Sequence, residues 1–151
     1  MNDTEDNDFI FMASSSSNIN ECNMLKTLSK QLKQPIHLKF DYVYNEPFFN
    51  VSDAVQKITF GGMFNQPVGC KNCCNKTCPK NLPNDLTHLT FEYNFNQKVD
   101  NLPKNLTHLT FDYNFNQKVD NLPKTLIYLK FGTKFNQHID NLCNSIDGKL
   151  S

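Results

Sequence analysis

The chain has 151 residues, enough for one domain with one continuous core and too few for two ordinary domains. Its 15 lysines balance 15 acidic residues and arginine is absent, so it offers neither a basic surface nor the guanidinium groups that read guanine and phosphate. No apolar run approaches the roughly 20 residues that span a bilayer, and the acidic start MNDTEDNDF is unlike a secretory signal. We therefore expect an intracellular, cytoplasmic protein that binds neither nucleic acid nor membrane.

The first 22 residues differ in composition from the rest of the chain. They begin with an acidic segment and continue into the SSSS run at 14–17. A segment with so little apolar content cannot bury enough surface to offset the entropy that ordering costs. We therefore expect residues 1–22 to form a disordered N-terminus.

A helical pattern follows over residues 23–35. The sequence MLKTLSKQLKQ places three leucines on one helix face, with Asn23 in position to cap its start and Pro35 to end it. These leucines are Leu25, Leu28 and Leu32. Because the end of a repeat array needs a cover, we expect this short helix to serve as the N-terminal cap.

The remainder of the chain repeats with a period of 20 residues. Residues 82–101, LPNDLTHLTFEYNFNQKVDN, and residues 102–121, LPKNLTHLTFDYNFNQKVDN, differ at three positions. Residues 122–141 form a third copy, which keeps the apolar positions while the polar ones vary. Two weaker units surround Phe40 and Phe60, which are again 20 residues apart. A period of this size predicts a solenoid, in which each unit buries its apolar face against its neighbours.

Within each unit the pattern L-x-x-L-x-F predicts one short strand. Leu89 and Phe91 are two residues apart and share a buried face, whereas the residue before each of them points to the other face. Asparagine, aspartate and proline after the strand predict an arc that returns the chain to the next unit. We expect about five such units over residues 36–146, with parallel strands in one curved sheet and a tail at 147–151.

One unit carries 11 additional residues, CKNCCNKTCPK at 70–80, which hold four of the six cysteines. The insertion falls between two strands, so the repeat can continue in register after it. Its C-x-x-C and C-x-x-x-C pairs can supply four thiolates to a tetrahedral zinc ion, although four ligands within nine residues leave little chain to wrap the metal. The candidate ligands are Cys70, Cys73, Cys74 and Cys78. A surface loop with reduced thiols and a disulfide or redox role are the alternatives.

The full pattern L-P-x-x-L-x-x-L-x-F-x-x-x-F-N-Q-x-V/I-x-N resembles the FNIP repeat, a relative of the leucine-rich repeat abundant in social amoebae and in giant viruses of amoebae. Three units match closely, and the units around Phe40 and Phe60 match more weakly. The resemblance implies a mostly β, leucine-rich-repeat-like solenoid used for protein–protein interaction, often joined to an N-terminal F-box. A substrate-adaptor role as in the F-box proteins is an alternative, although residues 1–35 contain no F-box pattern.

The outward side chains of the strands form columns across the concave face, on rungs about 4.8 Å apart. We expect this face to bind a partner protein, one of the host cell. The contributing residues are His37, Lys39, Lys57, Thr59, His88, Thr90, Glu92, His108, Thr110, Asp112, Tyr128 and Lys130. His88 and His108 on adjacent units can share a metal ion or respond to pH, or can be duplicated residues on a solvated face.

The FNQ sequence repeats an asparagine at each turn after the strand. These asparagines are Asn65, Asn96, Asn116 and Asn136. We expect a structural role, in which each side-chain amide pairs with backbone groups of the neighbouring unit. The glutamines that follow them either act in the same way or are exposed.

The sequence contains no dinucleotide-binding glycine motif, P-loop, nucleophile elbow or H-E-x-x-H zinc motif. Glu92 and Asp112 resemble an acid–base pair, but a shallow sheet offers no pocket to raise the pKa of one carboxyl. The sequence therefore predicts a non-catalytic interaction module without a cofactor. A small zinc-binding protein that uses the segment from Cys70 to Cys78 is the alternative.

Overall fold

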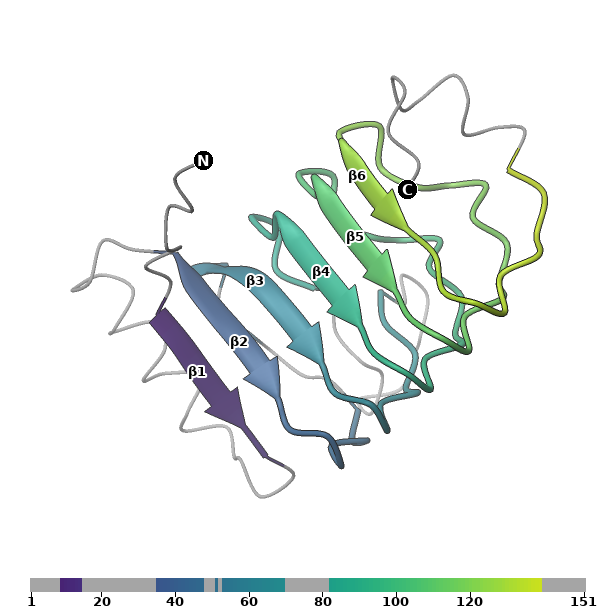
Figure 1. Cartoon of the computed structure of the whole chain (residues 1–151). Coiled ribbons are helices and arrows are strands. Elements are labelled where there is room, and N and C mark those ends of the chain that lie inside the picture. The colour runs from purple at the N-terminus through teal and green to yellow at the C-terminus, as the bar shows by residue number, and fades with distance from the viewer. Residues whose placement is uncertain (1–8, 15–34, 48–50, 52, 70–81, 140–151) are drawn as a thin grey trace, which may run out of the picture.

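The computed structural model describes residues 9–14, 35–47, 51, 53–69 and 82–139, which contain β-strands and no helix. The strands are β1 (Phe9–Ala13), β2 (Ile36–Phe40), β3 (Val55–Phe60), β4 (His88–Phe91), β5 (His108–Phe111) and β6 (Tyr128–Lys130). They form one 6-stranded parallel sheet in chain order, and Figure 1 shows the chain returning from the end of β4 to the start of β5 and from the end of β5 to the start of β6. The predicted architecture, mostly β with parallel strands in one sheet, is confirmed.

The strand register follows the sequence repeat. His88 pairs with His108 and Leu89 with Leu109, so equivalent positions of adjacent units lie side by side. Strand β3 pairs with β4 in the same way, with Phe60 beside Phe91, although these residues are 31 apart in the sequence. The insertion at 70–80 therefore leaves the register intact, as predicted. One irregularity interrupts the ladder, between Ile36 and His37 where β2 meets β3.

Two columns of aromatic rings run through the core. Within a unit, the strand phenylalanine stacks on the aromatic residue of the arc, as Phe111 does on Phe115 with ring centroids 3.7 Å apart. Between units, Phe91 stacks on Phe111 at 5.6 Å, and Phe91, Phe111 and Phe115 are all fully buried. Offset and parallel ring contacts add to the free energy gained by burying the rings. The aromatic stacking therefore connects neighbouring rungs as well as the strand and arc of one unit.

A first strand, β1, lies within the segment predicted to be disordered, so that prediction is wrong for Phe9–Ala13. It pairs in parallel with β2, from Phe9 beside Ile36 to Ala13 beside Phe40. Composition averaged over residues 1–22 concealed a run, FIFMA, that is too short for a helix yet long enough for a strand of about five residues. Phe11 and Ala13 contact the core, whereas Ile10 and Met12 project outward.

Three of the predicted segments lie wholly or almost wholly outside the residues that the structure describes. The capping helix at 23–35 lies outside the described residues apart from Pro35, which directly precedes β2. The cysteine insert at 70–80 and the tail at 147–151 also lie outside them. Within the described ranges, no helix is long and apolar enough to cross a bilayer.

Candidate functional site

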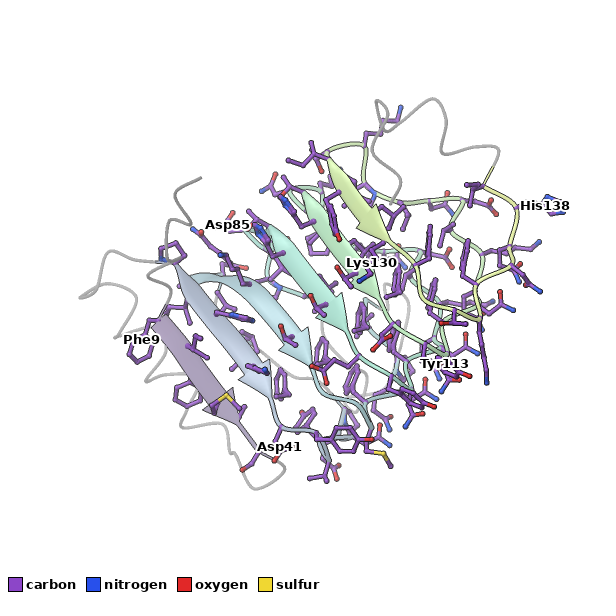
Figure 2. The ribbon with its side chains drawn as sticks, in the orientation of Figure 1. Phe9, Asp41, Asp85, Tyr113, Lys130 and His138 are labelled. Atoms are coloured by element: carbon purple, nitrogen blue, oxygen red, sulfur yellow. The ribbon has the colours of Figure 1, made fainter. Side chains whose placement is uncertain are left out.

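The outward side chains of the strands form two straight columns, which we call the strand face. The strand pairing aligns the first column, which consists of Ile10, His37, Lys57, His88, His108 and Tyr128. The second column consists of Met12, Lys39, Thr59, Thr90, Thr110 and Lys130. Figure 2 shows side chains projecting from the sheet, with Lys130 labelled on β6. Ten of the predicted partner-binding residues thus lie together on one surface, as the period-2 alternation of a strand requires.

Strand β1 adds an apolar end to the strand face that the sequence analysis missed. The side chains of Ile10 and Met12 are 56% and 58% exposed and occupy the columns next to His37 and Lys39. The alternation of FIFMA, with two residues outward and the others inward, is the signal that could have revealed them. The strand face is therefore apolar at β1 and polar across β2 to β5.

The remaining predicted residues, Glu92 and Asp112, lie just beyond the carboxyl ends of β4 and β5. Their backbone N–H groups continue the ladder, donating to the carbonyls of Phe60 at 3.2 Å and Phe91 at 3.0 Å. The backbone carbonyl of each residue then accepts a hydrogen bond from the backbone N–H of the arc phenylalanine three residues later, Phe95 or Phe115, which closes a tight turn. These two residues form a rim at the ends of the columns rather than part of them.

Two imidazole rings stack at the centre of the strand face. The ring centroids of His88 and His108 are 4.1 Å apart and their planes differ by 7°. In each case Nδ1 lies 2.9 Å from the hydroxyl of the preceding threonine, Thr87 or Thr107. Each hydroxyl donates to a backbone carbonyl, at 3.1 Å and 3.0 Å, so its single proton is already used. Nδ1 must therefore donate to the hydroxyl oxygen, which places the acceptor lone pair of each neutral ring on Nε2.

The electrostatic surroundings favour a neutral ring at His108. Burial lowers the pKa of His108 below the usual value of 6.5, and the positive charge of Lys57 lowers it further. Among the described residues, no group of three or more histidine, cysteine, aspartate or glutamate side chains is arranged to hold a metal ion. The described histidines therefore do not assemble a metal site of the usual kind.

On the arc side, the FNQ asparagines Asn65, Asn96 and Asn116 each bind the next unit, as predicted. The Oδ1 atom of Asn96 accepts from the backbone N–H of Asn116 at 2.9 Å and from Nε2 of Gln117 at 3.1 Å. Asn65 binds Asn96 and Gln97 in the same manner, and Asn116 binds Asn136 and Gln137. The column extends back to Asn45, which the sequence analysis did not include. The glutamines share the structural role.

An open groove of about 680 Å³ runs along these asparagines at the carboxyl ends of the strands. Its lining consists of Asn45, Met63, Asn65, Asn94, Asn96, Asn114, Asn116 and Lys134. Figure 2 labels Tyr113, the neighbour of Asn114, at this end of the sheet, and Asp85 near the opposite end. We call this feature the asparagine groove. It was not predicted, because the sequence shows the repeated amides without showing that their turns leave a hollow between them.

The repeat resembles a known repeat family and a solved structure. Residues 98–134 match the family model described as FNIP Repeat. A solved structure of CroV588, described as a novel circular LRR protein and from a giant virus, is 35% identical in sequence with a TM-score of 0.48. The alignment covers 73% of this chain and 19% of that chain, so the chain spans about a fifth of that protein's length. No curated protein matches the sequence.

Proposed function

Because the chain contains FNIP repeats, which are of the leucine-rich-repeat type, we propose that it is a non-catalytic module that binds a partner protein. The binding surface in this proposal is the strand face, which we expect to be concave. One observation carries the proposal: equivalent side chains of successive units lie in register from β2 to β6. Such a surface repeats its chemistry at fixed intervals, which suits an extended partner segment that crosses the strands.

The chemical character of the strand face supports protein binding. Exposed apolar side chains at Ile10 and Met12 lie beside a polar field of histidine, threonine and lysine. Tyr128 ends the first column and stacks against His108 at 5.7 Å. Apolar and aromatic anchors beside polar groups are common in protein interfaces.

The size of the strand face suggests a modest interface. Five strand spacings of about 4.8 Å and four residues of about 3.3 Å give a projected area of roughly 300 Å². A stable complex buries about 800 Å² on each partner. We therefore expect the partner to extend past the columns onto the rim formed by Glu92 and Asp112, and the complex to be transient if it does not.

Affinity capture from host cells with three forms of the chain tests the proposal. The strand-face variant carries His88→Ala, His108→Ala and Lys130→Ala. The control variant carries Lys98→Ala, Lys118→Ala and His138→Ala, three exposed residues of the arcs. A protein retained by the wild type and the control but lost from the strand-face variant supports the proposal, and identical captures by all three forms refute it.

A further inference from the structure

The asparagine groove presents unused hydrogen-bond donors in a row. A backbone N–H can only donate, so the atom of Asn65, Asn96 or Asn116 that it meets is Oδ1, and Nδ2 is directed elsewhere. No hydrogen bond within the described residues uses Nδ2 of these three asparagines. Among the described residues, Asp41 Oδ1 is the buried polar side-chain atom that lacks a hydrogen-bond partner. The unpaired Nδ2 atoms of the three asparagines are therefore not buried. The three amide groups are therefore open to solvent in the groove that they line.

A further row of side chains, formed by Asn94, Asn114 and Lys134, also lines the asparagine groove. Asn114 Nδ2 donates to Asn94 Oδ1 at 3.0 Å, and Asn94 Nδ2 lies 3.4 Å from the sulfur of Met63. Lys134 continues this row, with its ammonium 5.1 Å from the centre of the Tyr113 ring. Lys134 is the one charged side chain among the described lining residues. The groove is therefore almost neutral and rich in amide N–H donors, with amide oxygen available at Asn114.

We propose that the asparagine groove binds a linear, uncharged oligosaccharide of β-1,4-linked hexose units. Each sugar hydroxyl can accept a hydrogen bond from an amide N–H and donate one to an amide oxygen, which matches this mixture of groups. In an extended β-1,4-linked chain, one pyranose unit advances by slightly more than one rung of the solenoid, which is about 4.8 Å, and successive units turn opposite hydroxyl-bearing edges to the same side. Successive sugars can thus meet successive asparagines. The groove volume of about 680 Å³ also falls in the range of small-molecule sites.

Two other extended ligands fit less well. The carbonyl groups on one side of an extended peptide repeat at about 6.7 Å, against about 4.8 Å between rungs, so the two fall out of step within a few units. A polyanion needs several cations, and the described lining holds Lys134 alone. Neutral hydroxyl groups at the spacing of the rungs remain the best match. This inference uses a different surface from the strand face and does not depend on the proposed function.

Nuclear magnetic resonance with cellohexaose tests the inference. We expect titration of the full chain to shift the side-chain amide signals of Asn65, Asn96 and Asn116. The blocking variant is Asn114→Tyr, which fills the groove without removing any acceptor of the backbone ladder. The matched control is Asn105→Tyr, an exposed asparagine of the same rung whose Nδ2 also donates one hydrogen bond to the preceding unit, at 3.2 Å. Asn105 is equivalent to Asp85, labelled in Figure 2 away from the groove.

The expected result is binding of cellohexaose by the wild type and by the control, with affinity at least about tenfold weaker in the blocking variant. Thermal unfolding of all three proteins shows whether each is folded before titration. Absence of amide shifts in the folded wild type overturns the inference, as does equal binding by the two tyrosine variants. Shifts of the same amides with an uncharged serine–asparagine peptide, and none with cellohexaose, likewise overturn it. The strand-face variant should bind cellohexaose normally whether or not the strand face binds a protein.

Discussion

The side-chain oxygen of Asn96 holds two units together through two hydrogen bonds, from the backbone of Asn116 and from Gln117. Substitution by alanine leaves a half-buried backbone N–H without a partner, which costs about 1 to 3 kcal/mol. We therefore expect Asn96→Ala to lower the free energy of unfolding by that amount in a chemical denaturation experiment. Asn94→Ala is the control, because the side-chain oxygen of Asn94 accepts only from the side chain of Asn114. Equal loss of stability in the two variants would contradict the structural role of the FNQ asparagine.

His108 should make stability depend on pH in a defined direction. Burial and Lys57 lower its pKa in the folded protein below the usual 6.5, so the unfolded chain takes up the proton more readily. Stability is then fully present above pH 6.5 and is lost as pH falls through the lowered pKa of the folded state. A titration of the His108 ring by nuclear magnetic resonance should give a midpoint below 6.5. A midpoint at or above 6.5 would contradict this assignment, and His108→Gln should remove that part of the pH dependence of unfolding.

Much of the residue-level chemistry followed from the repeat itself. Identical residues at a 20-residue interval predicted that His88 lies beside His108 and that each FNQ asparagine meets the next unit. The stacking distance, the tautomer fixed by Thr87 and Thr107, and the lowered pKa could not be predicted in this way. They depend on rotamers and on burial, which a periodic pattern does not specify.

At the level of elements, β1 is the clearest difference between expectation and structure. Phe11 packs against the core from β1, whereas Met12 on the same strand is 58% exposed. We expect Phe11→Asp to detach β1, because it places a carboxylate against apolar side chains, and Met12→Asp to leave the strand in place. Hydrogen exchange of the Asp41 amide, which donates to the carbonyl of Ala13 at 2.9 Å, reports the detachment directly. Slow exchange of that amide in the Phe11 variant would show that β1 does not depend on this contact.

Because each unit contacts only its neighbours, the damage should remain local. The amides of β5 should keep their protection in the Phe11→Asp protein, since β5 pairs with β4 and β6 and not with β1. Loss of protection throughout the sheet would instead indicate one cooperative unit.

The cysteine insert at 70–80 lies outside the described residues, and its metal content stays a prediction. The close spacing from Cys70 to Cys78 favours reduced thiols over a zinc site. Protein purified without chelator should therefore contain less than about a tenth of an equivalent of zinc by elemental analysis. A full equivalent that is lost when Cys70 and Cys73 are replaced by serine would establish the zinc-binding alternative.

At the scale of the whole molecule, the 20-residue period predicted the parallel sheet but not the strand β1 at its N-terminal edge. The parallel sheet and the aromatic columns follow from apolar positions that recur every 20 residues from Phe40 onward, apart from the 11-residue insertion between Phe60 and Phe91. Strand β1 pairs with β2 across 27 residues and shares no repeat pattern with it, so periodicity gave no signal there. The asparagine groove depends on how neighbouring turns pack, which is a property of several units together.

The central claim is that the strand face binds a protein. The most direct measurement compares the affinity of a captured partner for the wild type, the strand-face variant and the arc control, which carries Lys98→Ala, Lys118→Ala and His138→Ala, with each protein shown to be folded. We expect the combined change of His88, His108 and Lys130 to weaken binding by at least about tenfold, while the arc control binds as the wild type does. Equal affinity of the strand-face variant and the wild type, or a loss confined to the arc control, would contradict it.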